Sequence, residues 1–384
     1  MYGIRHKKLG RSFYEECLDA SSALAAGGFG LEDGYLLAVY PFVRRNPFLR
    51  MLYSADFDKG FATSGIEKLE HLNDVPSGLN VVVHYHWIHR VFDHATNAHS
   101  ANQQVTEFLG TIQRQKDAGQ TIMWTVHNIL SHGSRFPEEE AKLRADFAGL
   151  VDHIHIMNPA TRALCAGHYN LPADKIFEVP HPSYYGVYGD YVSKSQARFS
   201  FGLQPDDKVF LLFGGMGPFK GTHQFLSQMD ALQSAAGGKA RVVIAGQAGE
   251  PAYMEDLFQL TAGRADVQFH LGHVSDRNVQ NFFRAADVAV CAHPSGLNSG
   301  VANTAVSFGK PVVLAHDLAG TLSGIEDYIF RFDPEDTATC TQSCVAALAV
   351  ADQSDCVRAL TAWAQAMAPQ KMSARFFDAL RARL

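Results

Sequence analysis

Two patterns are missing from this sequence of 384 residues, and each absence excludes a class of protein. No run of about 18 apolar residues occurs, so we expect no helix that spans a membrane, and we recognise no signal peptide. The cysteines form no Cys-x-x-Cys pair, which argues against a zinc site and against a disulfide framework. The sequence therefore predicts a cytoplasmic protein with reduced cysteines and no bound metal or cofactor.

The chain also has fewer basic than acidic residues. The chain carries 33 lysines and arginines against 39 aspartates and glutamates, a net charge of −6, which disfavours a general nucleic-acid role. Hydrophobic residues make up 47% of the sequence, enough to bury sizeable cores. At about 100 to 200 residues per domain, a chain of this length predicts two domains.

Segments typical of strands and of helices alternate along the chain. We expect strands at 35–43, 80–84, 121–126, 153–157, 209–213, 241–245, 267–270, 288–292 and 311–315. We expect helices at 13–24, 104–116, 137–149, 161–167, 277–284, 301–308 and 370–384. This alternation predicts the α/β class, with parallel sheets and right-handed crossovers.

A change of composition marks the expected boundary between domains. Residues 171–193 are rich in proline, glycine and tyrosine, as linkers between domains are. We therefore predict an amino-terminal domain over 1–182, a second domain over 183–368 and a carboxyl-terminal helix over 369–384 that packs back on the first domain.

The segment 209–222, VFLLFGGMGPFKGT, opens the second domain and indicates an anion site. Five apolar residues predict a buried strand, and Gly214, Gly215 and Gly217 then permit a tight turn that a ligand can approach closely. Lys220 follows, just before a run with helical periodicity from His223 to Leu232. The motif is neither a Walker A sequence nor G-x-G-x-x-G, so the interpretation rests on local physics: amide groups, a helix dipole and an ammonium group converge there.

In addition, seven motifs in matching order make the chain resemble GT-B-fold glycosyltransferases. They are HYHW (84–87), TVHNILSH (125–132), VPHPSYYGVY (179–188), LFGGMGPFKG (212–221), VVIAGQAG (242–249), LGHVSDRNVQNFFRAADVAV (271–290) and LNSGVANTAVSFGKPVV (297–313). The resemblance implies two Rossmann-like doubly wound domains facing a cleft, with the acceptor on the first and a nucleotide sugar on the second. It is greatest to bacterial transferases that build exopolysaccharides and other cell-surface glycans.

The resemblance also implies where a UDP- or GDP-sugar would lie. Its diphosphate would sit between two groups of residues, one formed by Gly214, Gly215 and Lys220 and the other by Asn298, Ser299 and Gly300. Its base would rest near His273 and Val274, and Glu326 falls where such enzymes sometimes hold the ribose.

Two departures from the family pattern bear on the mechanism. Gly296 and Thr304 stand where retaining members usually carry two glutamates, and Gly215 replaces an arginine. These replacements leave three interpretations open: an inverting glycosyltransferase, a non-catalytic relative that binds a nucleotide or a glycan, and a nucleotide-sugar epimerase.

Inverting transfer needs a base, and the strand ends of the first domain supply histidines. His127 is the leading candidate, because a pKa near neutrality suits general base catalysis, and hydrogen bonding to the donor sugar is its alternative role. His84, His86 and Asn128 complete the expected acceptor side.

The expected acceptor is a glycan or a lipid-linked oligosaccharide, and a mixed basic and apolar segment suggests how the protein would reach it. Arg44, Arg45, Phe48, Leu49 and Arg50 predict peripheral contact with the inner membrane surface.

Overall fold

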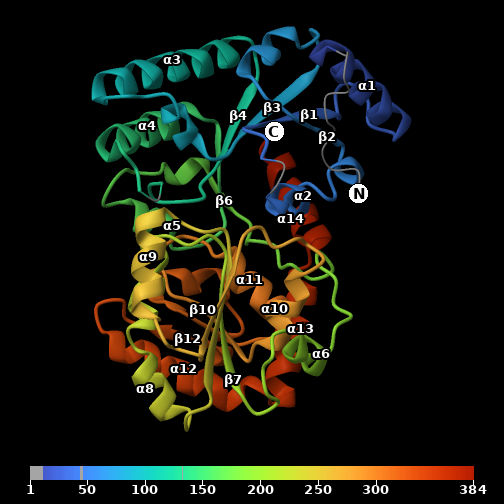
Figure 1. The fold of residues 1–384 in the computed structure, drawn as a ribbon. Helices are drawn as coiled ribbons and strands as arrows, with labels where there is room; N and C mark the ends of the chain where they lie inside the picture. The colour runs from blue at the N-terminus through green and yellow to red at the C-terminus, as the bar shows by residue number, and fades with distance from the viewer. Residues whose placement is uncertain (1–11, 44–45, 132) are drawn as a thin grey trace. The chain divides into compact units, whose positions relative to one another are not determined.

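The computed structural model describes residues 12–43, 46–131 and 133–384 and divides into two compact units. Unit 1 comprises residues 1–182 and 369–384, and unit 2 comprises residues 183–368. Each unit contains a six-stranded parallel sheet with helices packed against it, which confirms the predicted α/β class (Figure 1).

The sheet of unit 1 has the strand order β2-β1-β3-β4-β5-β6. Its strands are β1 (Tyr35–Tyr40), β2 (Phe61–Gly65), β3 (Asn80–Tyr85), β4 (Thr121–Thr125), β5 (His153–Ile156) and β6 (Ile176–Glu178). Its helices are α1 (Phe13–Ala26), α2 (Pro47–Leu52), α3 (Ala98–Asp117), α4 (Pro137–Leu150), α5 (Thr161–Cys165) and α14 (Pro369–Arg381). Because β2 and β3 lie on opposite sides of β1, the sheet is doubly wound.

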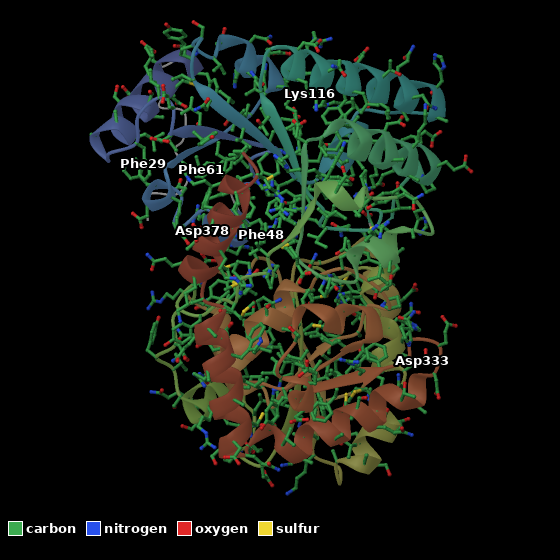
Figure 2. The ribbon with its side chains drawn as sticks, turned by 180° about the vertical axis from the view of Figure 1, so that it is seen from behind. Phe29, Phe48, Phe61, Lys116, Asp333 and Asp378 are labelled. Carbon is green, nitrogen blue, oxygen red and sulfur yellow. The ribbon has the colours of Figure 1, made fainter. Side chains whose placement is uncertain are left out.

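Helix α14 lies against α2 within unit 1, although it follows unit 2 in the chain (Figure 1). The Ser373 hydroxyl donates to the carbonyl of Leu52 at 2.7 Å and accepts from the amide of Ala55 at 2.9 Å. Phe376 and Phe377 of α14 are fully buried. Figure 2 shows Phe48 of α2 beside this helix, which also carries Asp378.

The sheet of unit 2 has the strand order β12-β11-β10-β7-β8-β9. Its strands are β7 (Lys208–Phe213), β8 (Ala240–Gly246), β9 (Val267–Leu271), β10 (Val288–Cys291), β11 (Val312–Ala315) and β12 (Ile329–Phe332). Its helices are α6 (Lys194–Ser200), α7 (Thr222–Leu226), α8 (Met229–Ala235), α9 (Pro251–Leu260), α10 (Val279–Ala285), α11 (Gly300–Ser307), α12 (Thr337–Ala351) and α13 (Ser354–Ala366). The winding reverses between β7 and β10, so the topological switch point lies there.

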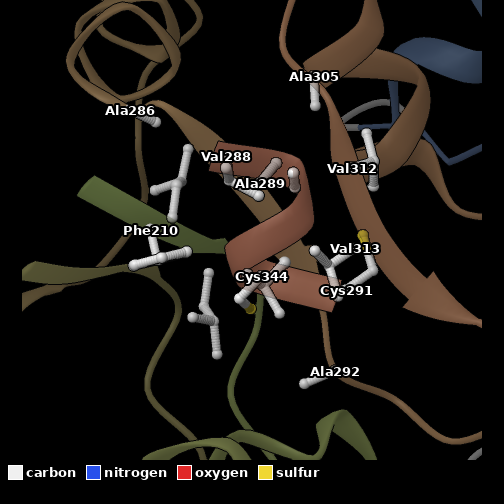
Figure 3. Packing of buried hydrophobic residues seen from close by; sticks show 14 of the residues in the cluster. Phe210, Ala286, Val288, Ala289, Cys291, Ala292, Ala305, Val312, Val313 and Cys344 are labelled. Carbon is white, nitrogen blue, oxygen red and sulfur yellow. The ribbon is translucent and has the colours of Figure 1, made fainter. Parts of the chain in front are cut away.

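The central strands of unit 2 are buried on both faces, as their continuous apolar sequences predict. Figure 3 shows Phe210 of β7 and Val288 of β10 in this core, with Cys344 of α12 packed against them. The resulting scaffold fixes the carboxyl ends of β7 and β10.

The structure corrects several predicted elements. The first strand ends at Tyr40 instead of Val43, because Pro41 has no amide group to continue the ladder. The single helix expected after Lys220 is replaced by the two short helices α7 and α8, and a 3₁₀ turn (Pro218–Lys220) precedes them. Strand β6 lies within the segment that we interpreted as a linker.

Candidate functional site

In unit 2, a small cavity lies at the switch point between the ends of β7 and β10. Its lining includes Gly214, Gly215, Lys220, His293 and Val301, and its volume is about 30 Å³. Open α/β sheets bind ligands at such strand ends. The glycine turn and the start of α11, which we predicted as two parts of one anion site, therefore line one cavity.

Close backbone packing holds the glycine turn. A Cβ atom on Gly246 would lie 1.8 Å from the carbonyl oxygen of Gly214, and one on Gly221 would lie 2.0 Å from the carbonyl oxygen of Ala292. Gly221 also has a left-handed φ of 68°. Only glycine fits at these two positions, so the turn is seated directly on the ends of β8 and β10.

Lys220 ends the 3₁₀ turn and lines the same cavity. Its side chain is half-buried, and its ammonium group lies 5.3 Å from the ring centroid of Phe219. Burial lowers the pKa of Lys220, and the nearby Cys291 thiol partly opposes that shift. Because a desolvated ammonium group gains more from an anionic partner than a solvated one, this lysine suits charge neutralisation.

Helix α11 reaches the cavity through Val301, whereas the predicted group of Asn298, Ser299 and Gly300 precedes that residue and lies outside the lining. Ser299 caps the helix by accepting from the amide of Ala302 at 3.2 Å, and its hydroxyl lies 3.4 Å from the Cys291 thiol. A Cβ atom on Gly214 would lie 3.8 Å from Val301, which places the glycine turn beside the first turn of α11. Asn298 is half-buried just before the cap.

The residues predicted to contact the base and the ribose also lie outside the lining of this cavity. His273 is exposed and Val274 half-buried in the bend after β9, the edge strand. Glu326 is exposed, and its carboxylate accepts from the amide of Gly324 at 2.8 Å. Their roles toward base and ribose remain predictions.

The positions where glutamates were expected hold residues with structural contacts. The Thr304 hydroxyl donates to the carbonyl of Gly300 at 2.7 Å, within the first turn of α11. A Cβ atom on Gly296 would lie 3.0 Å from a methyl group of Leu318.

In unit 1, the ends of four adjacent strands carry a histidine cluster, which consists of His84, His86, His127, His155 and His181. Residues two apart along a strand point to the same face, so the pairs at 84 and 86, 125 and 127, and 179 and 181 each align. The parallel register sets Thr125 opposite His155 and His155 opposite Phe177.

Hydrogen bonds link four of these five rings, and two hydroxyl groups serve as bridges, whereas His181 Nδ1 lies 2.7 Å from the carbonyl oxygen of Pro182. Tyr53 Oη lies 2.7 Å from His84 Nδ1 and 2.6 Å from His86 Nε2. Thr125 Oγ1 lies 2.6 Å from His84 Nε2 and 2.9 Å from His155 Nδ1.

The two ends of this network are different in kind. At one end, His155 Nε2 lies 3.0 Å from the carbonyl oxygen of Val179. At the other, His86 Nδ1 lies 2.8 Å from Nε2 of His127, which is half-buried and stacks on Trp87. His127 is therefore the member of the hydrogen-bonded network nearest to solvent.

Burial dominates the electrostatics of the cluster. It lowers the pKa values of His84, His86 and His127 well below the usual value, and the neighbouring imidazoles lower them further. Burial also lowers the pKa values of His155 and His181 to about 4. The five rings are thus neutral at neutral pH, and the near-neutral pKa on which we based the choice of His127 is wrong.

Two predicted acceptor-side residues need correction. His84 and His86 are fully buried and both nitrogens of each ring are hydrogen-bonded, so they support His127 and do not face an acceptor. Asn128 follows His127, and its carbonyl accepts from Arg144 at 2.9 Å.

Sequence reasoning missed Tyr53, Thr125, His155 and His181 as members of this site. The usable signal was the recurrence of histidine two residues after another inward-facing residue at the ends of successive strands. Tyr53 carries no such signal, because it follows the short helix α2.

The predicted membrane segment also needs correction. Phe48 and Leu49 are buried, and the Phe48 ring lies 5.1 Å from that of His127. Arg50 is exposed, whereas Arg44 and Arg45 lie outside the described residues. Apolar residues that pack inside unit 1 cannot insert into a lipid surface, so this segment loses its apolar contribution.

Two features are absent from the described residues. Within residues 12–43, 46–131 and 133–384, no helix combines the length and apolarity that crossing a membrane requires. The same part of the chain contains no group of three or more His, Cys, Asp or Glu side chains arranged to hold a metal ion.

Comparison with known proteins now adds a family match. Residues 193–340 match the family model described as glycosyl transferases group 1. An uncharacterized glycosyltransferase of Methanocaldococcus jannaschii is 30% identical over 153 residues, which is 38% of this chain and 38% of that relative. The match thus spans well under half the length of the curated relative.

Solved structures agree over more of the chain. Anabaena HepE in complex with UDP has a TM-score of 0.67 at 14% identity, covering 91% of this chain and 100% of that one. The UDP-forming α,α-trehalose-phosphate synthase of Burkholderia vietnamiensis has a TM-score of 0.60 at 11% identity, covering 91% and 99%. The chain therefore has the GT-B fold of these proteins, and its residues 193–340 are similar to the group 1 glycosyl transferases.

Proposed function

We propose that this protein is a glycosyltransferase that moves a hexose from a UDP- or GDP-sugar to a glycan or lipid-linked oligosaccharide. One observation carries the proposal: the glycine turn, Lys220 and the first turn of α11 line a single cavity at the switch point of unit 2. The family match includes all three.

The donor diphosphate would be held by backbone and lysine. Amide groups of Gly214 and Gly215 and the start of α11 would meet its oxygens, and Lys220 would neutralise the charge that develops on the leaving group. This arrangement needs no metal ion. His273 and Val274 would contact the base, and Glu326 the ribose.

His127 of unit 1 would act as the general base of an inverting transfer. The acceptor hydroxyl would give its proton to His127 while its oxygen bonds to the anomeric carbon. The bond from that carbon to the diphosphate oxygen would break, and its electron pair would leave with the diphosphate. The absence of carboxylates at positions 296 and 304 favours inversion over the retaining pathway.

The same absence also supports a second candidate, a non-catalytic relative that binds a nucleotide or a glycan. The role in polysaccharide assembly rests on the sequence resemblance, and an acceptor in the membrane remains part of the proposal. With Phe48 and Leu49 buried, any membrane contact would depend on charge alone.

The test is turnover of a panel of nucleotide sugars by the purified full chain. We expect release of UDP or GDP from at least one of UDP-glucose, UDP-N-acetylglucosamine, UDP-galactose and GDP-mannose, with inverted anomeric configuration in the product. UDP or GDP binding by calorimetry without turnover, even with lipid-linked acceptors present, would instead favour the non-catalytic candidate.

A further inference from the structure

Hydrogen bonds join His84, His86, His127 and His155 of the histidine cluster into one continuous chain, and its fixed end determines the direction of every proton. At that end lies the carbonyl oxygen of Val179, which can only accept. His155 must therefore carry its proton on Nε2. Because the buried ring of His155 is neutral, its Nδ1 atom is an acceptor, and Thr125 donates to it.

The same argument assigns the donor and the acceptor at each of the two hydroxyl groups. Thr125 has one proton, which it gives to His155, so its oxygen accepts from Nε2–H of His84. Nδ1 of neutral His84 must then accept from Tyr53. Tyr53 in turn has no second proton, so its oxygen accepts from Nε2–H of His86.

The last link reaches the half-buried ring. His86 carries its proton on Nε2, so its Nδ1 atom accepts from Nε2–H of His127. The opposite direction would require His155 to carry protons on both nitrogens, since Thr125 would then accept from its Nδ1 atom. Burial of that ring away from water makes such a cation costly.

We propose that this chain, anchored at Val179, fixes neutral His127 as the Nε2–H tautomer and so makes its Nδ1 atom a proton acceptor. Tyr53 and Thr125 are positioning residues. Each hydroxyl donates to one imidazole and accepts from the next, and so determines which nitrogen of the next ring carries the proton. The tautomer follows from the hydrogen-bond geometry and from the neutrality of the buried rings, whereas its use in sugar transfer rests on the proposed function.

The arrangement has a further chemical consequence. When Nδ1 of His127 takes a proton, Nε2–H still donates to His86, so no other hydrogen bond in the chain must reverse. Phe48 and Trp87 pack against the His127 ring and hold its orientation. Proton uptake therefore reverses no hydrogen bond of this chain, which favours a base, although burial lowers the pKa of His127.

The direct test is nitrogen NMR of the full chain with ¹⁵N-labelled histidine at pH 7.5, in which the two nitrogens of each ring report where the proton lies. A His127→Gln variant identifies the signals of His127. We expect only the Nε2–H tautomer in the wild-type protein. A ring protonated on Nδ1, or a mixture of tautomers, would overturn the proposal whether or not the protein transfers sugars.

Removing one positioning hydroxyl should release the tautomer. In Tyr53→Phe, His86 and His127 are cut off from the anchor, so we expect both tautomers of His127 to be populated. Thr125→Val should do the same, because it separates His155 from the other rings. An unchanged Nε2–H tautomer in both folded variants would show that the anchor does not set it.

Matched controls come from the same sheet. Tyr85→Phe removes a buried phenol that donates to Gln115 at 2.7 Å outside the chain. Thr63→Val removes a buried hydroxyl that has no hydrogen-bond partner among the described residues. Both controls should leave the His127 signals unchanged.

Activity provides the second readout once a donor is known. We expect Tyr53→Phe to lower kcat about 10- to 100-fold and to leave the KM for the nucleotide sugar unchanged, with wild-type kcat in Tyr85→Phe. Equal loss in both variants would contradict the positioning role. Absence of turnover by the wild-type protein would overturn the proposed function and leave the NMR result standing.

Discussion

At the strand ends of unit 1 the chain presents buried imidazole and hydroxyl groups, whereas at the strand ends of unit 2 it presents glycine backbone and one lysine. In the first arrangement, hydrogen bonds join the side chains from Val179 to the half-buried ring of His127. The second surrounds a cavity of about 30 Å³. Two sheets of similar topology thus supply different chemistry: one orients a proton acceptor, and the other offers donors to an anion.

The largest difference that we expect between the two units is the effect of acid on their stability. The histidine cluster has lowered pKa values, so the unfolded chain binds more protons below pH 6.5. Stability of unit 1 is therefore full above pH 6.5 and falls as the pH decreases, by up to about 1.4 kcal/mol per pH unit for each histidine.

The tryptophans allow this fall to be assigned to a unit. Trp87 and Trp124 lie in unit 1 and Trp363 in unit 2. In a Trp363→Phe variant, the urea midpoint followed by fluorescence should fall between pH 7 and pH 5. An unchanged midpoint would mean that the stability of unit 1 does not depend on neutral histidine rings in the cluster.

Gly221→Ala should disrupt unit 2 locally. The new Cβ atom would meet the carbonyl of Ala292 at 2.0 Å, so we expect a loss of more than about 3 kcal/mol in unfolding free energy. Gly237→Ala is the control, since Gly237 has a similar φ of 62° and nothing within 4 Å. It should cost only about 1 kcal/mol. Equal losses in urea unfolding would show that strained φ, and not close packing, holds the turn.

Lys220→Ala should remove turnover and leave the fold intact. We expect a loss of at least about 100-fold in kcat, or about 2.7 kcal/mol, because the leaving diphosphate loses its cation. Lys239→Ala, which removes an exposed lysine paired with Asp206, should retain activity. Activity is measured by nucleotide release from variants with equal melting temperatures. Comparable activity in the two variants would show that Lys220 does not neutralise the leaving group.

Ser299→Ala should have the smallest effect. Loss of the cap should cost about 1 kcal/mol of stability, as should Ser193→Ala at the start of α6. Only the first variant should also weaken UDP binding, since α11 begins at the cavity. Equal UDP affinity of both variants, measured by calorimetry, would show that the start of α11 does not contribute to the anion site.

Local sequence predicted the parts of the fold that local physics determines. Runs such as 209–213 are apolar because a parallel strand is buried on both faces, and the glycine turn after them follows from backbone sterics. Short edge strands such as β2 and β12 carry a weaker signal, and we did not predict them. The break between α7 and α8 was also missed, because apolar periodicity continues across it.

The histidine cluster was only partly predictable for a different reason. His127 could be placed at a strand end from sequence, but its role depends on Tyr53 and His155, which reach it through contacts between strands and helices. Register between strands determines those contacts, and a single sequence does not encode register in any local pattern.

The position of α14 has a consequence for biosynthesis. Phe376 of this helix lies against the rings of His84 and His155, and Ser373 ties the helix to residues 52 and 55. The ribosome makes these residues only after all of unit 2 has been translated. Packing of Phe376 on His84 and His155 can therefore form only after α14 has been translated, so the core of unit 1 is completed after the chain of unit 2 has been made.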